Sequence, residues 1–414
     1  MAKDLKKFVN ARFIRTVDPG LMRRLLDRHA DELPSLDLAL LDRDPDAARR
    51  ILLEFFAGPE DTYPNRLLIE LHAIAELGSA NGQRLLLEQA RRMHLPVAPA
   101  NDNDSDGQAR QEPKQFALQM FLDHPGVFTA ASDMLSYTTL SSPSEFDGEE
   151  EGVEAQLDDE TRANFKRDAE RLFEVELRGR YCLVDWYEDG DEVHVVVKHG
   201  APLKTTEIIE GADDRIITFR EAERTVLSYS SLTGRLKVGG FPKSRCAELA
   251  EFFSTNILKR TGFFAAPDAQ DLYTLGPVER AGFGFAFEHA FDPGIRRVQI
   301  TEVQADRIGL DQRSGQMRAL YSHVTRGGKE NALARLHDDA PGISLGHVWR
   351  LNHLTLRVHF DVGETRPVTA TIKIKPPRTA MFKRHRFEDR IMTLLRRNGL
   401  INDRAPGRAV AAAE

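Results

Sequence analysis

Cysteine is scarce in this sequence. Only Cys182 and Cys246 occur among 414 residues, which excludes a disulfide framework and a metal site built from cysteines alone. Both lie in segments whose patterns are typical of folded structure. We therefore expect two reduced thiols in the core of a cytoplasmic protein.

Long apolar runs are also absent. No stretch approaches the roughly 18 uncharged apolar residues of a membrane-spanning helix, and Met1–Lys7 lacks the apolar segment of a secretory signal. Hydrophobic residues nevertheless make up 41% and charged residues 29% of the chain, which is an ordinary balance for a globular protein. The composition predicts a soluble protein that makes no contact with a membrane.

Motifs of the common enzyme classes are missing too. The chain has no Gly-x-Ser-x-Gly nucleophile motif, no His-Glu-x-x-His zinc motif and no nuclease-like Glu-x-Lys at the end of a strand. The sequence therefore identifies no catalytic residue and favours a protein that is not an enzyme. A hydrolase or nuclease whose catalytic residues are dispersed along the chain stays open as the alternative.

Partial motifs for nucleotides and calcium fail for physical reasons. Gly282–Gly284 lacks the third glycine that opens a helix in a dinucleotide site, and Gly327–Lys329 lacks the other residues of a P-loop. Asp102–Gly107 resembles the start of an EF-hand loop, but Pro113 stands where the bidentate glutamate belongs. These three segments predict no bound nucleotide and no calcium ion.

Histidine is the remaining source of metal ligands, and the best cluster is His347, His353 and His359. A strand advances by about 3.3 Å per residue, so positions six apart lie about 20 Å apart. A single ion binds its ligands at about 2 Å and cannot bridge that separation. The sequence therefore predicts no metal and no other cofactor.

The chain divides into five expected segments, whose boundaries follow shifts in composition and in the period of apolar residues. They are a helical module over residues 1–96, a disordered linker over 97–114, an α+β domain over 115–267, a second α+β domain over 268–400 and a disordered tail over 401–414. The expected fold class is α+β, with an all-helical N-terminal module and a mixed antiparallel-sheet body that ends in a hairpin and a basic helix.

Local signals indicate where helices and strands begin. Asp18-Pro19 and Asp44-Pro45 each place a capping side chain before a proline at the first helical position. Thr225–Tyr229 and Arg235–Val238 flank a Ser-Leu-Thr-Gly turn, which predicts a hairpin. In Gly282–Phe287, three phenylalanines alternate with small residues, and this alternation predicts a strand with one aromatic face.

An acidic block lies within the first α+β domain. Nine Asp or Glu and no Lys or Arg occur between Glu145 and Glu160. Like charges at this density repel one another, so we expect a disordered acidic loop over residues 144–160. Such a loop could cover a basic surface of the same chain as an internal competitor.

The C-terminal part carries the opposite charge. Between Lys373 and Arg397, nine Lys or Arg stand against Glu388 and Asp389, a local net charge of +7 in a chain whose net charge is −7. A concentrated patch of this sign on an acidic protein indicates a surface that meets a negative partner.

Two strand patterns precede and enter this basic region. Leu354–Phe360 and Val368–Lys375 alternate apolar and polar residues, and pairing them as a hairpin directs both apolar rows to the core. The opposite face then presents a row of residue types that contact phosphate. The row consists of Thr355, Arg357, His359, Thr369, Thr371, Lys373 and Lys375.

We expect a helix after Pro377 that ends at Gly399. Its buried face consists of Phe387, Ile391, Leu394 and Leu395. Early in this helix lie Lys383, Arg384 and Arg386, where the helix dipole disfavours cations. Helix stability therefore does not account for these three side chains.

The candidate nucleic-acid-binding residues are Arg357, Lys373, Lys375, Lys383, Arg384 and Arg386. No helix-turn-helix, zinc-finger or RNA-recognition signature is present, so the sequence predicts contact with the nucleic acid backbone without reading of bases. The expected function is that of a non-catalytic binding subunit in a cytoplasmic complex of bacterial type. An acidic protein partner, or pairing of the basic side chains with carboxylates of the same chain, are the other interpretations.

Overall fold

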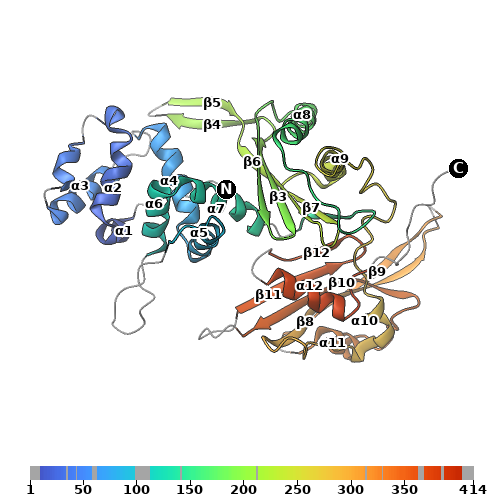
Figure 1. Ribbon diagram of the computed structural model, residues 1–414. Helices are drawn as coiled ribbons and strands as arrows, with labels where there is room; N and C mark the ends of the chain where they lie inside the picture. Colours follow the sequence, from blue (N-terminus) through green and yellow to red (C-terminus); the bar gives the residue numbers. More distant parts are fainter. Residues whose placement is uncertain are drawn as a thin grey trace. The chain divides into compact units, whose positions relative to one another are not determined.

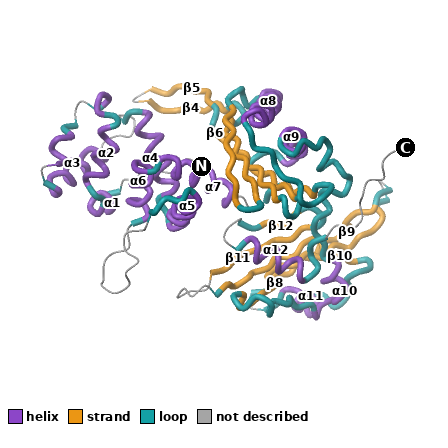
Figure 2. The backbone as a smooth tube through the Cα atoms, in the orientation of Figure 1, coloured by secondary structure: helices purple, strands orange, loops and turns teal. Residues whose placement is uncertain are grey.

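The computed structural model describes residues 10–33, 36–42, 44–57, 63–97, 112–139, 142–210, 213–312, 315–328, 330–361, 368–383 and 387–402. The chain forms two compact units, Met1–Ser136 and Tyr137–Glu414. The first is helical, and the second is built mainly from antiparallel sheets (Figures 1 and 2). The α+β class expected from the sequence is confirmed.

Capped and amphipathic helices make up the first unit. Asp18 accepts a hydrogen bond from the Gly20 amide at 2.8 Å, and Asp44 accepts one from the Ala47 amide at 3.2 Å, so both predicted caps are confirmed. The helices are α1 (Ala11–Thr16), α2 (Pro19–Asp27), α3 (Pro45–Ala57), α4 (Asn65–Leu77), α5 (Ala80–Arg92), α6 (Pro113–Asp123) and most of α7 (Pro125–Thr139).

Helix α6 belongs with these N-terminal helices. It packs against α2, α4 and α5 and buries Phe116, Leu118 and Met120. The structure therefore divides the chain after Ser136, whereas the composition and apolar pattern predicted an α+β domain over residues 115–267. The pattern of α6 shows that it buries apolar side chains but not which helices it packs against, since that information lies in tertiary contacts.

The first sheet of the second unit has five antiparallel strands in the order β1-β7-β6-β3-β2. Helices α8 (Asp159–Val175) and α9 (Cys246–Asn256) pack against it, and Phe165, Phe253 and Tyr229 lie in the shared core (Figure 1). The predicted hairpin is present as β6 and β7. The strands are β1 (Ser144–Asp147), β2 (Cys182–Asp189), β3 (Glu192–Gly200), β6 (Ala222–Ser230) and β7 (Arg235–Gly239), and a separate ribbon pairs β4 (Lys204–Glu210) with β5 (Asp213–Phe219).

The acidic block is part of the folded unit, contrary to the expected disorder. Glu145 lies on β1, is buried, and accepts a hydrogen bond from Tyr273 Oη at 2.7 Å. Glu150 forms an ion pair with Arg260 at 2.7 Å. Asp158 caps α8 by accepting from the Thr161 amide, a bond that lowers the pKa of this carboxyl. Specific partners offset the repulsion between the carboxylates of the block. These partners cannot be inferred from the composition of the block.

The second sheet also has five antiparallel strands, in the order β12-β11-β10-β8-β9. The predicted C-terminal hairpin is confirmed as β10 and β11, with Leu354 opposite Ile374 and Phe360 opposite Val368. The strands are β8 (Ile295–Leu310), β9 (Met317–Arg326), β10 (Trp349–Phe360), β11 (Val368–Lys375) and β12 (Thr379–Met381).

Three helices pack against the apolar core of this sheet (Figure 1): α10 (Gly276–Ala281), α11 (Ala332–Asp339) and α12 (Glu388–Arg397). Phe387 stacks on Phe360 with ring centroids 4.1 Å apart. The predicted burial of Phe387, Ile391, Leu394 and Leu395 is confirmed. The predicted helix start after Pro377 is wrong, because Thr379–Met381 first pairs with β11 and the helix begins at Glu388.

The expected strand over Gly282–Phe287 is also wrong. Gly282–Gly284 forms a 3-10 turn directly after α10, and Gly282 has a φ of 65°, which glycine adopts without strain. Phe283, Phe285 and Phe287 still pack against the second core. The alternating apolar residues here indicate which side chains are buried, but they do not indicate an extended backbone.

Candidate nucleic-acid interface

The β10–β11 hairpin separates apolar from polar side chains as its sequence predicts. The apolar rows are buried in the core. On the opposite face, Arg357, Thr369, Thr371 and Lys375 are exposed. The predicted polar face is thus formed. Together with the outward side chains of β8, it makes up a surface that we call the basic sheet face.

Strand β8 adds a third row that sequence reasoning did not assign to this surface. Arg297 lies opposite His359, Gln299 opposite Arg357, and Glu302 opposite Thr355. Register shifts between β8 and β10 adjust the pairing along the strands. The sequence predicts a strand near Val298–Val303. The residues with which this strand pairs on β10 lie about 55 positions away in the chain, so no local sequence pattern predicts the pairing.

Cationic side chains gather at one end of the basic sheet face. Burial lowers the pKa of His359, and the nearby charges of Arg297, Arg357 and Arg296 lower it further. His359 therefore favours its neutral form, first because it is partly buried and second because its surroundings are positive. This end of the sheet has the electrostatic character of an anion-binding surface.

One carboxylate interrupts the positive charge. Glu302 accepts hydrogen bonds from Arg326 Nε at 2.7 Å, from His353 Nε2 at 2.8 Å and from Lys373 Nζ at 3.4 Å. These partners hold the pKa of Glu302 at about 2. Lys373 is accordingly half-buried and engaged within the chain, while Arg357 and Lys375 form no ion pair with any described residue.

The remaining candidates lie beyond the hairpin. Lys383 is exposed and lies two residues after Met381, the last residue of β12. Its expected place inside a helix is wrong, since α12 begins at Glu388 with an acidic first turn, as the helix dipole favours. Arg384 and Arg386 lie outside the described residues. The structure thus brings Arg357, Lys373 and Lys375 together on one face.

The other segments considered in the sequence carry structural roles. The amide of Gly327 donates to Thr301 O at 2.9 Å, and the carbonyl of Gly328 accepts from Gln299 Nε2 at 3.3 Å; Lys329 is outside the described residues. His353 bonds to Glu302. The calcium-like segment 102–111 also lies outside the described residues. Among the residues that the structure describes, no group of three or more His, Cys, Asp or Glu is arranged to hold a metal ion.

Both cysteines are buried and unpaired. Burial raises the pKa of Cys182 to about 12 and also raises the pKa of Cys246. Neither thiol therefore has the character of a nucleophile. In the described part of the chain, no helix is both long and apolar enough to cross a membrane.

No protein-family model matches the chain, and no curated protein matches it significantly. A function for the basic sheet face therefore has to be inferred from its geometry and charge.

Proposed function

We propose that this chain is a non-catalytic binding protein that contacts the phosphate backbone of nucleic acid through the basic sheet face. The observation that carries the proposal is the exposure of Arg357 and Lys375 on a face whose neighbouring positions are threonines. Guanidinium, ammonium and hydroxyl groups are the donors that proteins use on phosphate oxygens.

The charge balance of the face supports a polyanion as the partner. Arg297, Arg357, Lys373 and Lys375 provide four positive charges along β8, β10 and β11. On the same face of β8, Glu302 and, farther along the strand, Asp306 provide two negative charges. Lys383 adds exposed positive charge just after β12. The whole chain is acidic, with a net charge of −7, so the positive charge of this face stands out from the average surface.

The side chains of the face favour backbone contact over base stacking. Where β10 and β11 pair, the outward side chains are threonines, lysines, His359 and Arg357, and aromatic rings such as Phe360 lie on the buried side. Sheets that bind single strands present exposed aromatic rings to the bases. We accordingly expect binding to duplexes without sequence preference.

The proposal is tested by fluorescence anisotropy with labelled DNA and RNA duplexes of unrelated sequence, at salt concentrations from about 50 to 200 mM. Wild-type protein should bind each duplex with similar affinity, and affinity should fall steeply with salt. The double substitution R357E/K375E should abolish binding at the lowest salt concentration. No binding by the wild type, or equal binding by this variant, would contradict the proposal.

The same incubations address the alternative of a nuclease. Gel analysis of the duplexes after incubation with divalent cations should show intact strands. Cleavage that persists in R357E/K375E would point to a dispersed catalytic site elsewhere in the chain.

A further inference from the structure

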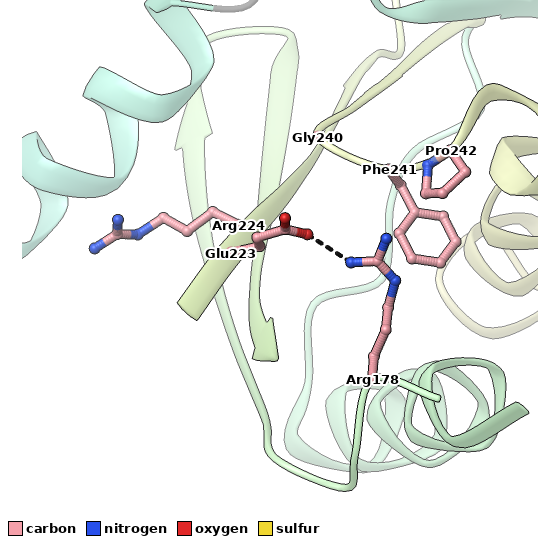
Figure 3. A pocket seen from close by; sticks show the side chains of 6 residues that line it. All are labelled: Arg178, Glu223, Arg224, Gly240, Phe241 and Pro242. Atoms are coloured by element: carbon pink, nitrogen blue, oxygen red, sulfur yellow. Dashed lines mark hydrogen bonds and ion pairs between the residues drawn. The ribbon is translucent and has the colours of Figure 1, made fainter. Parts of the chain in front are cut away.

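A pocket of about 460 Å³ opens at the end of the first sheet of the second unit. Figure 3 shows it between the start of β6, the segment after β7 and the turn that follows α8. Its lining residues are Arg178, Glu223, Arg224, Gly240, Phe241 and Pro242. The volume falls within the range of about 300–1,000 Å³ that small-molecule sites occupy.

Arg178 is the central polar group of this pocket. Only 8% of its side chain is exposed. Its Nη1 lies 2.5 Å from Glu223 Oε2, and its guanidinium carbon lies 4.9 Å from the centroid of the Phe241 ring. A guanidinium group has five N–H donors, and a buried charge is costly unless hydrogen bonds satisfy it.

Some of the N–H donors of Arg178 have no hydrogen-bond acceptor among the described residues. Arg178 Nε is buried without a hydrogen-bond partner, and Nη2 donates to no described residue. In Figure 3 the guanidinium extends into the space between Glu223 and Phe241. A nearly buried arginine with spare donors at the edge of a cavity has the properties of an anion-binding group.

The wall behind Arg178 is rigid and carries no competing charge. The His199 ring stacks on Phe173 at 4.2 Å and meets Phe241 edge to face at 5.9 Å. Its two nitrogens lie 2.9 Å from Gly200 O and 2.8 Å from Thr225 Oγ1. These contacts fix the aromatic wall, so a ligand meets a preformed surface.

We infer that this pocket binds a small organic anion, whose carboxylate or phosphate group accepts hydrogen bonds from Arg178 while its apolar part contacts Phe241 and Pro242. Glu223 is 40% exposed on its side chain, so it can turn toward solvent when the ligand anion takes over its place beside Arg178. The ligand site is separate from the basic sheet face, since its residues lie on β6 of the other sheet or in the segments that follow β7 and α8.

Isothermal titration calorimetry with phenyl phosphate and benzoate tests the inference, since both join an oxyanion to an apolar ring. Benzyl alcohol is the uncharged control, and inorganic phosphate is the control without a ring. The account expects saturable binding of at least one aromatic anion and about tenfold weaker binding of both controls. The stronger of the two aromatic anions identifies the preferred head group.

Three matched variants locate the binding. Glu223→Gln removes the competing charge and should tighten anion binding about threefold or more. Arg178→Gln should abolish binding. Arg171→Gln should leave it unchanged, because Arg171 lies on α8 with its side chain 72% exposed and does not line the pocket.

Glu223→Gln keeps the test decisive if Arg178→Gln fails to fold. Absence of saturable binding in both the wild type and Glu223→Gln overturns the inference. So does equal affinity for benzyl alcohol, or a loss in Arg171→Gln as large as the loss in Arg178→Gln.

Discussion

Lys373 Nζ on β11 lies 3.4 Å from Glu302 Oε1 on β8, across the intervening strand β10. Glu302 also forms hydrogen bonds with Arg326 and His353, so one carboxylate engages two cations and one imidazole. The basic sheet face therefore has two parts: Lys373 is restrained within the chain, while Arg357 and Lys375 are available for a partner.

Replacing this carboxylate should change stability and binding in opposite directions. Glu302→Gln removes charge-assisted hydrogen bonds and should lower the free energy of unfolding by about 1–2 kcal/mol at neutral pH. It also releases Lys373, so duplex binding should tighten and its log–log salt slope should steepen by about 0.9. Weaker or unchanged binding by Glu302→Gln at low salt would show that Glu302 does not restrain the face.

The pH dependence of the stability difference has a definite sign. Because the pKa of folded Glu302 is lowered from 4.5 to about 2, its ionised form stabilises the fold above the unfolded-state pKa, and that contribution is lost as pH falls toward the folded pKa. Wild type and Glu302→Gln should therefore differ most near neutral pH and converge near pH 2. Urea unfolding at several pH values measures this, and a constant difference would contradict it.

A nearly buried ion pair between Lys237 and Glu388 should be important for the second unit. Lys237 Nζ lies 2.6 Å from Glu388 Oε1, with side chains 12% and 11% exposed, and Tyr137 Oη donates to Glu388 Oε2 at 3.0 Å. Lys237→Met leaves a buried carboxylate without its cation, so it should lower the free energy of unfolding by about 3 kcal/mol.

Tryptophan fluorescence reports this unfolding selectively, because the chain's two tryptophans, Trp186 and Trp349, both lie in the second unit. Lys204→Met is the matched control. Its ion pair with Glu221 is exposed, so its loss should cost less than about 1 kcal/mol. Equal effects of the two substitutions would mean that burial of the Lys237–Glu388 ion pair does not increase its contribution to the free energy of unfolding.

Both cysteines should resist modification in the folded protein. Cys182 and Cys246 are buried, and burial raises the pKa of each thiol, so little thiolate exists near neutral pH. A thiol-specific chromogenic reagent should react with neither cysteine until denaturant is added, and then with both. Rapid reaction of either thiol without denaturant would contradict the packing around it.

The C-terminal hairpin was predictable because its information is local. Strict alternation in Leu354–Phe360 and Val368–Lys375 predicted which side chains enter the core, and both apolar rows are buried in the paired strands β10 and β11. The buried positions of α12 were predictable for the same reason. Its start was not, because Thr379–Met381 adopts a strand only through pairing with β11.

Features that depend on distant partners were not predictable. The sequence shows Lys373 as one more outward cation, whereas Glu302, 71 residues away, determines its surroundings. Charge density alone suggested disorder for the acidic block, whereas Tyr273, 128 residues from Glu145, holds its first strand in place. The pocket at Arg178 likewise joins segments that no local motif connects.

The most direct test of the central claim is the salt dependence of duplex binding for matched charge reversals. Arg357→Glu and Lys375→Glu reverse exposed cations on the basic sheet face, and Arg171→Glu makes the same change on α8, where the side chain is 72% exposed.

The account predicts that each of the first two substitutions flattens the slope of log affinity against log salt by about 0.9 or more, while Arg171→Glu leaves it unchanged. Lys373→Glu should act less strongly than Lys375→Glu, because Glu302 already engages Lys373. Identical slopes for the wild type, Arg357→Glu and Lys375→Glu would contradict a nucleic-acid interface on this sheet.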